Sequence, residues 1–154
     1  MIDSHCHLEQ KDFDADRDKV IEACRKEGVK AIVTCCARPK DFDLTMEIVS
    51  RHKGYVFPCI GIHPEFIKEI PEKEIDNFIS TIKKNREKTV AIGEVGLDFN
   101  WVKEPEWQER QRALFVRMIA LAKELEKPLV IHARDAYEEA LDILEQEGAE
   151  NVLM

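Results

Sequence analysis

The sequence predicts an α/β protein in which parallel strands alternate with helices. Short apolar runs recur along the 154 residues at fairly even intervals, and amphipathic stretches lie between them. At 44%, the hydrophobic content is sufficient for one domain with a packed core. Strands that alternate with helices at this spacing form βαβ units with right-handed crossovers, so we expect a parallel sheet.

Six apolar runs are predicted to form strands. They are MID at the N-terminus, KAIVTCC from Lys30, YVFPCIGI from Tyr55, TVAIGEV from Thr89, PLVIHAR from Pro128 and NVLM from Asn151.

Five helices are expected between these strands, over approximately 16–27, 40–52, 75–82, 105–126 and 137–144. In two of them apolar residues recur at i, i+3, i+4 and i+7, as in Ile75, Phe78, Ile79 and Ile82. The residues predicted to be core in the fourth helix are Phe115, Met118, Leu121, Ala122 and Leu125.

Helix ends are marked by capping residues. Gly28 and Gly148 are placed where a glycine closes a helix, and Pro105 is placed where a proline opens one. Asp135, with Glu138 three residues later, predicts an N-cap for the fifth helix.

The number of elements leaves two architectures open. Five βα units and the opening of a sixth strand are too few for an eight-stranded barrel, which commonly needs about 200 residues or more. Either the sheet is open and doubly wound, or residues 1–154 are part of a longer barrel. The apolar NVLM stretch has no cap beyond it, which favours the second alternative.

Charge and composition exclude several classes of protein. The 23 basic and 31 acidic residues give a net charge of −8, which argues against a broad basic face for nucleic acid. Any phosphate site must therefore be local. The five cysteines form no C-x-x-C pair, so we expect reduced, mostly buried thiols. Without a signal peptide or an apolar run of about 18 residues, a cytoplasmic protein with no membrane partner is expected.

Polar residues interrupt four predicted strands near their carboxyl ends, where α/β folds build their sites. They are His5 and His7 in the first strand, His63 in GIHP, Glu94 and Asp98 in GEVGLD, and His132 and Arg134 in IHARD.

Three imidazoles and one carboxylate at this edge predict a site for divalent cations. Nitrogen and oxygen donors suit Zn²⁺ or Mn²⁺, and Mg²⁺ is less natural for histidine. We predict His5, His7, Glu94 and His132 as metal ligands, with Glu94 bridging two cations and acting as a catalytic residue. The H-x-H pair alone would be as consistent with a surface or hydrogen-bonded feature.

Three further residues are candidates for substrate contact. His63 is predicted to lie behind the ligands or to contact a substrate phosphate rather than to bind a cation. Asp98 either orients substrate or caps a loop, and Arg134 either holds a phosphate or pairs with a carboxylate.

Other polar and aromatic residues carry weaker expectations. Asp3 either supports a ligand histidine or fixes the loop at the strand end. Trp101 and Trp107 either stack on a base or pack beside a helix, and packing is the commoner role. His52 is expected on the surface.

The motifs together resemble one known family. DSHCHL, GIHPE, AIGEVGLDF and the stretch WQERQRALFVRMIALAKELEKPLVIHARDA are similar to the TatD-type metal-dependent deoxyribonucleases of the amidohydrolase superfamily. The resemblance implies a (β/α)₈ TIM barrel in which two divalent cations, Zn, Mn or Mg, activate water to hydrolyse phosphodiester bonds of DNA. It matches His5, His7, Glu94 and His132 to the family's ligands and places His63 near the substrate phosphate.

The resemblance also implies a histidine in strand six and an aspartate at the end of strand eight, which residues 1–154 do not contain. These residues are thus expected to be the N-terminal part of a single barrel domain and to be catalytically inactive, or nearly so, alone. Two alternatives stay open. One is a related hydrolase acting on a phosphoester, lactone or amide, and the other is a non-catalytic metal-binding or assembly module.

Overall fold

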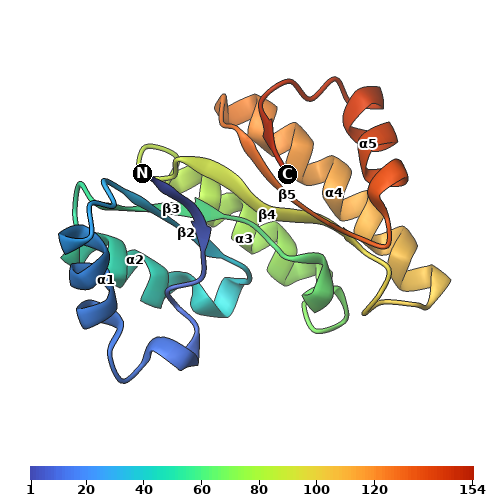
Figure 1. Ribbon diagram of the computed structural model, residues 1–154. Helices are drawn as coiled ribbons and strands as arrows, with labels where there is room; N and C mark the ends of the chain where they lie inside the picture. The colour runs from blue at the N-terminus through green and yellow to red at the C-terminus, as the bar shows by residue number, and fades with distance from the viewer.

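The computed structural model describes residues 1–154 as one parallel sheet of six strands with five α-helices and three short 3₁₀ helices. Figure 1 shows the strands side by side in chain order, from β1 to β6. Every neighbouring pair is parallel. The predicted parallel α/β class is confirmed.

The strands fall within or beside the predicted apolar runs. Their bounds are β1 Asp3–Cys6, β2 Ile32–Cys36, β3 Val56–Ile60, β4 Ala91–Asp98, β5 Leu129–Arg134 and β6 Val152–Leu153. Met1 and Ile2 precede β1 and stay exposed, so the first strand begins later than the MID run suggested.

The helices occupy the expected intervals. Their bounds are α1 Arg17–Lys26, α2 Phe42–Arg51, α3 Glu72–Lys84, α4 Pro105–Leu125 and α5 Tyr137–Gln146, with 3₁₀ helices at Lys11–Phe13, Pro39–Asp41 and Pro64–Lys68. None of them combines the length and apolarity that a membrane crossing needs.

Three of the predicted helix ends are confirmed and one is wrong. Pro105 is the first residue of α4, and Gly28 and Gly148 follow α1 and α5 with φ of 86° and 59°. The predicted cap by Asp135 does not form, because the N-cap of α5 is Ala136 and no side chain caps it. Asp135 instead lies in the left-handed region, with φ of 54°, one residue before the cap.

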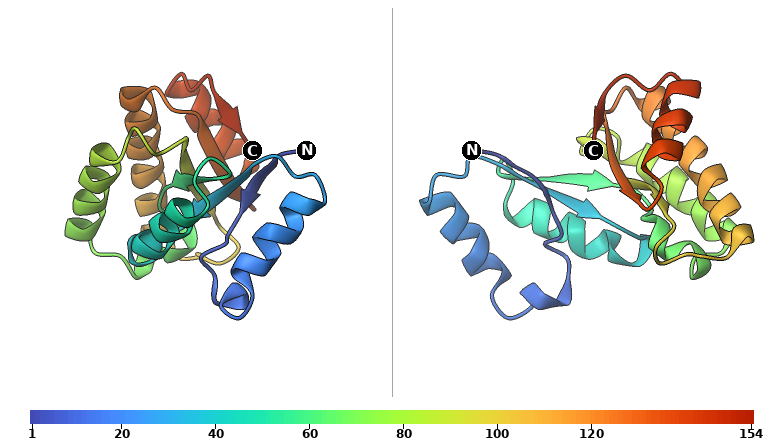
Figure 2. Two further views of the ribbon diagram at one scale, coloured as in Figure 1. Left: turned by 90° about the vertical axis from the view of Figure 1, so that its left-hand side faces the viewer. Right: turned by 45° about the vertical axis from the view of Figure 1, so that its right-hand side comes forward.

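The order of strands places all five helices on one side of the sheet. Right-handed crossovers that always advance in the same direction leave each helix on the same face. Figures 1 and 2 show the helices along the outer side of a curved sheet. A doubly wound sheet would reverse its order, so that alternative is wrong. Within these residues β1 and β6 each pair on one side, and the sheet stays open.

The main core lies between the helices and the sheet. As predicted, α4 buries Phe115, Met118, Leu121 and Ala122 there, and Leu125 packs against them partly buried. The opposite face of the sheet carries small residues in a separate buried cluster, comprising Cys35, Cys59, Ala91 and Val130. All five cysteines are unpaired thiols, of which Cys6 and Cys24 are only partly buried.

Two glycines let β4 approach β5 closely. A Cβ on Gly93 would lie 2.6 Å from the carbonyl oxygen of Val130. Gly96 has φ of 140°, and a Cβ there would collide with the carbonyl oxygen of His132. This close packing brings Glu94, between the two glycines, next to His132 on the neighbouring strand.

Candidate metal centre

Five ionisable side chains meet where the parallel strands end. His5 and His7 come from β1 and the residue after it, His63 follows β3, Glu94 lies in β4 and His132 in β5. In two overlapping groups, His5 with His7 and Glu94, and His63 with Glu94 and His132, the donor atoms all lie within 4.8 Å of one another. The structure thus brings the four predicted ligands together with His63.

Glu94 directs its two carboxylate oxygens to different histidines. Oε2 lies 3.0 Å from Nε2 of His5 and 3.2 Å from Nε2 of His7. Oε1 lies 3.0 Å from Nδ1 of His132 and 3.7 Å from Nε2 of His63. Burial acts to raise the pKa of Glu94, but hydrogen bonds from His132, His5 and His7 outweigh it and hold this pKa well below its ordinary value. Glu94 is therefore an ionised carboxylate between two sets of imidazoles.

The local strand geometry helps to aim Glu94. The register of β4 against β5 shifts between Ile92 and Val95, which is the segment that contains Glu94. Such irregularities redirect a side chain out of the regular alternation of a strand.

His7 is held through its second ring nitrogen. Nδ1 lies 2.8 Å from the carbonyl oxygen of Cys35, and a carbonyl can only accept, so Nδ1 carries the proton and donates it. The other nitrogen, Nε2, faces Oε2 of Glu94, and it is the atom on which a cation would replace a proton. Glu9, with a side chain 2% exposed, also lies 3.2 Å from Nδ1 and accepts a hydrogen bond from Thr34. Hydrogen bonds to Glu9 and Glu94 raise the pKa of His7 to about 10.

The sequence analysis missed Glu9, although a signal for it was present. Asp3, His5, His7 and Glu9 continue one alternation, which brings a second carboxylate to the same segment. Asp3 was considered as the support for a ligand histidine, but its carboxylate accepts the backbone N–H of His5 at 3.2 Å. Asp3 thus fixes the strand end, the other role considered for it, and Glu9 contacts the histidine ring.

His5 completes the first group of donors. Its Nε2 lies 3.4 Å from Nε2 of His7, and both atoms face Oε2 of Glu94. Hydrogen bonding to the side chain of Cys35, and then to Glu94, raises the pKa of His5 to about 10.

His132 is held by a buried carboxylate. Its Nε2 lies 2.8 Å from Oδ2 of Asp98, a residue with no exposed surface, and its Nδ1 faces Glu94. Burial acts to lower the pKa of His132, but hydrogen bonds with Glu94 and Asp98 raise it. The other Asp98 oxygen accepts the backbone N–H of Trp101 at 2.7 Å. Asp98 therefore caps the loop after β4, one of the two roles considered for it, and also orients His132.

His63 differs from the other histidines in its proton position. Its Nδ1 accepts the backbone N–H of Glu65 at 3.2 Å, so the neutral ring carries its proton on Nε2. Burial and the neighbouring His132 lower the pKa of His63 to about 4, which keeps the ring neutral. A neutral N–H donor suits contact with an anionic oxygen better than binding of a cation.

The donor set fits divalent cations. Imidazole nitrogens and a shared carboxylate are the ligands that Zn²⁺ and Mn²⁺ take in proteins. Carbonyl or carboxylate oxygens hold one ring nitrogen of His7 and of His132, so the other nitrogen faces Glu94, where a cation would take the place of its proton. Such partners orient and tune metal-binding histidines. His5, His7, Glu94 and His132 are thus candidate metal ligands by their geometry and donor chemistry.

Arg134 lies at the end of β5 and Trp101 lies in the loop after β4, both beside this centre. Arg134 is exposed and forms no ion pair, and its guanidinium carbon lies 5.5 Å from the ring centroid of Trp101. Trp101 is 59% exposed, whereas Trp107 packs against the core, as expected of a residue beside a helix start. His52, expected on the surface, is partly buried at the end of α2. Its side chain is 10% exposed and pairs with the exposed Asp18, with Nε2 2.9 Å from Oδ1.

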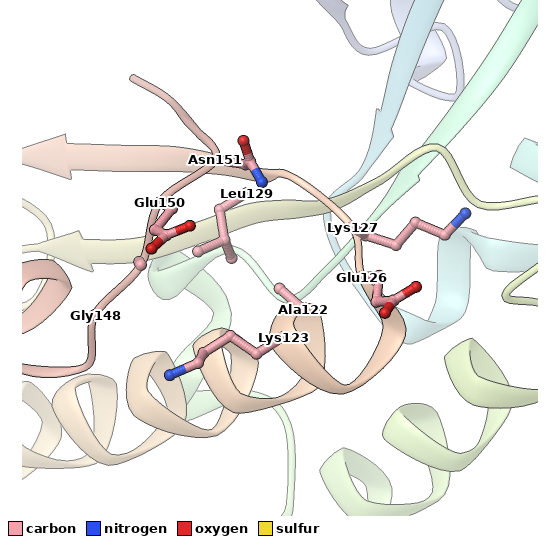
Figure 3. A pocket seen from close by; sticks show the side chains of 9 residues that line it. Ala122, Lys123, Glu126, Lys127, Leu129, Gly148, Glu150 and Asn151 are labelled. Atoms are coloured by element: carbon pink, nitrogen blue, oxygen red, sulfur yellow. The ribbon is translucent and has the colours of Figure 1, made fainter.

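A hollow at the other end of the sheet carries different chemistry. It has a volume of about 550 Å³ and lies between the end of α4, the start of β5 and the turn before β6 (Figure 3). Its polar side chains are Lys123, Glu126, Lys127, Glu150 and Asn151, with no histidine or cysteine. It opens beside Leu129, the first residue of β5, whereas His132 lies near the end of that strand.

Fold and site together define an α/β protein with a candidate metal centre at the carboxyl end of its sheet. The model of one family, the TatD related DNases, matches residues 2–154, and the chain belongs to this family.

Named relatives cover the whole chain or nearly so. It is 39% identical to "Putative deoxyribonuclease TATDN3" of Mus musculus, over 100% of this chain and 55% of the relative. It is 36% identical to "Deoxyribonuclease TATDN3" of Homo sapiens, over 100% and 59%. "Uncharacterized metal-dependent hydrolase YabD" of Bacillus subtilis is 37% identical, over 99% and 58%. The chain thus spans a little over half the length of these relatives.

Solved structures show the same fold. A hydrolase TatD family protein from Entamoeba histolytica matches with a TM-score of 0.84 and 22% identity, over 96% of this chain and 54% of that chain. The TatD homologue YJJV from Escherichia coli matches with a TM-score of 0.83 and 22% identity, over 96% and 56%. The singly wound arrangement of strands and helices is therefore one that other TatD proteins share.

Proposed function

We propose that this chain carries the metal centre of a hydrolase that cleaves phosphodiester bonds of DNA. One observation carries the proposal, namely that the two oxygens of Glu94 face two separate sets of histidines. A carboxylate arranged in this way can join two cations. The relatives named as deoxyribonucleases and metal-dependent hydrolases support the choice of reaction.

The cofactors of the proposal are two divalent cations. His5, His7 and Glu94 would hold one, and Glu94 and His132 would hold the other. Zn²⁺ or Mn²⁺ suits these donors better than Mg²⁺. When bound, the cations supply a water of lowered pKa and neutralise charge on the phosphoryl oxygens.

The side chains around the cations have distinct tasks. Glu94 stays ionised because hydrogen bonds from the neighbouring histidines hold its pKa well below its ordinary value. His63 directs an Nε2–H toward the centre and would donate it to a phosphate oxygen of the substrate. Asp98 has no exposed surface, and we assign it an indirect role in substrate binding, through the orientation of His132.

We further propose that residues 1–154 alone turn over DNA slowly or not at all. Each of the two groups offers at most three donors, and the N–H of His63 reduces the second group to two. Rapid, cation-dependent cleavage of DNA by the purified chain would contradict this part of the proposal.

The test combines cation binding with hydrolysis in Glu94→Gln, which keeps the shape of the side chain and removes its charge. We expect the wild-type chain to bind two Zn²⁺ ions by titration and the variant to lose at least one of them. Glu65→Gln is the matched control, since Glu65 is 45% exposed and 3.9 Å from Nδ1 of His63. It should bind both ions.

Hydrolysis is measured with the enzyme in excess over a labelled DNA strand, so that slow cleavage is detected. Phosphotriester, lactone and amide substrates are measured alongside. We expect any cleavage to favour the phosphodiester, to require the cation and to disappear in Glu94→Gln. Equal cation binding by wild type and variant, or cleavage that survives both a chelator and the substitution, would refute the proposal.

A further inference from the structure

Arg134 is the one arginine of the chain without a carboxylate partner. Every other arginine lies within 4.0 Å of an aspartate or glutamate oxygen. In a chain with 31 acidic residues and a net charge of −8, an uncompensated guanidinium is exceptional. Because Arg134 is exposed at the end of β5, its charge is available to an anion from solution.

Trp101 lies directly beside this charge. The guanidinium carbon of Arg134 is 5.5 Å from the centroid of the indole, within the range of a cation–π contact. Trp101 nevertheless remains 59% exposed, unlike Trp107, which packs against the core. A large aromatic surface therefore faces solvent next to an unpaired positive charge.

The pair is tied to the metal centre through shared contacts. One oxygen of Asp98 accepts the backbone N–H of Trp101 at 2.7 Å, and the other lies 2.8 Å from Nε2 of His132. Arg134 is two residues beyond His132 on the same strand, so the two side chains share a face of the sheet. Its carbonyl oxygen accepts the backbone N–H of Phe99 at 2.9 Å, which fixes the loop that carries Trp101.

We propose that Trp101 and Arg134 form a nucleotide platform beside the metal centre, with the indole stacking on an unpaired base and the guanidinium binding a phosphate of the same strand. This Trp101–Arg134 platform extends the proposed function, on which it rests for the choice of DNA. Bases in a duplex are covered on both faces by their neighbours, so the platform selects a single-stranded segment. A planar guanidinium supplies the paired donors that suit phosphate oxygens.

The experiment uses the two tryptophans of the chain as reporters. In the Trp107→Phe variant, Trp101 is the sole source of indole fluorescence. A short oligothymidylate is titrated in the presence of a chelator, so that hydrolysis does not interfere. An abasic oligonucleotide of the same length, which has the phosphates but no bases, is the comparison. We expect the oligothymidylate to quench the fluorescence strongly and the abasic strand to quench it little.

Affinities for labelled strands then separate the two halves of the platform. Trp101→Ala should weaken oligothymidylate binding by about tenfold or more, in the range of base–aromatic stacking, and Trp101→Phe should restore part of it. Arg134→Gln should weaken both strands. Arg86→Gln is the charge-matched control, because Arg86 is exposed near the other end of the sheet and pairs with Glu87. It should change neither affinity.

Two results would overturn the platform. One is the absence of oligothymidylate quenching in the Trp107→Phe variant. The other is an affinity of Trp101→Ala for the oligothymidylate that equals the affinity of the wild type. Because these measurements need no cation and no turnover, they are independent of the hydrolysis test. Strand binding by a chain whose Zn²⁺ binding is unchanged in Glu94→Gln would leave the platform intact and refute the proposed function. Loss of Zn²⁺ binding in Glu94→Gln, with no strand binding by the wild-type chain, would refute the platform alone.

Discussion

The exchange Glu9→Gln tests how the centre holds His7. Glu9 is buried, with a side chain 2% exposed, and its two oxygens lie 3.2 Å from Nδ1 of His7 and from Oγ1 of Thr34. Glutamine keeps the size of the side chain and removes the negative charge that favours a proton on Nδ1. Carboxylates in this place raise the basicity of a metal-binding histidine. The variant should therefore bind a cation less tightly.

The size of the effect follows from the other partner of His7. Losing such a carboxylate costs about 10- to 100-fold in cation affinity. The Cys35 carbonyl, at 2.8 Å, still orients the ring in the variant, so we expect the lower end of that range. In the cation-free protein the variant loses one buried hydrogen bond between charged groups, worth about 1.5 kcal/mol. For a chain of this length that lowers the melting temperature by about 3 to 6 °C.

The assay has two readouts that do not depend on turnover. Isothermal titration with Zn²⁺ gives the affinity, and thermal unfolding with a chelator gives the stability of the cation-free protein. Glu65→Gln serves again as the control, because this exposed carboxylate lies 3.9 Å from the ring of His63. It should leave both quantities unchanged.

A Glu9→Gln protein with wild-type zinc affinity and wild-type melting temperature would refute the reasoning. That result would mean that the Cys35 carbonyl alone fixes the proton on Nδ1 of His7, and that the carboxylate contributes nothing to the ligand. A loss of affinity equal to that in Glu65→Gln would lead to the same conclusion.

Three further predictions concern the close strand packing, His63 and one surface pair. Gly96→Ala should lower the free energy of unfolding by about 1 to 3 kcal/mol in urea, because the added Cβ collides with the His132 carbonyl, and an unchanged midpoint would contradict the close approach. His63→Gln should retain zinc affinity within about twofold and weaken binding of inorganic phosphate to the zinc-loaded protein, and a large loss of zinc would make His63 a ligand. Hydrogen bonding from His52 lowers the pKa of Asp18 from 3.8, so the stability that Asp18 contributes is present above that pH and lost as the pH falls below it. Urea midpoints of wild type and Asp18→Asn should differ at neutral pH and converge in acid, and a gap that persists in acid would refute the assignment.

The arrangement of the fold could be predicted from the sequence because each strand is a short apolar run. Burying a polar side chain inside a parallel sheet is unfavourable, which is why the sequence marks Glu94 and His132 as candidate site residues. Parallel strands bring their carboxyl ends to the same edge, so the approach of these residues to His5 and His7 followed from topology alone.

The contacts behind the ligands could not be predicted, because they depend on side-chain and backbone positions far apart in the sequence. The proton position of His7 is set by the carbonyl of Cys35, an atom that every residue possesses and that leaves no trace in composition. His52 is covered by Asp18, 34 residues earlier, through the packing of two helices. The cap expected at Asp135 failed for a local reason, since the turn there takes a left-handed conformation.

The ring nitrogen that points away from Glu94 divides the histidines into two chemical types. In His7 and His132 that nitrogen donates to an oxygen, so the nitrogen that faces Glu94 can exchange its proton for a cation. In His63 it accepts a backbone N–H, so a proton faces Glu94 and the ring opposes a cation on that side. The three donors of the first group are therefore all usable, whereas the second group retains Glu94 and His132. A cation with two protein donors is held weakly and positions a substrate poorly, which is the physical reason to expect little turnover from these 154 residues alone.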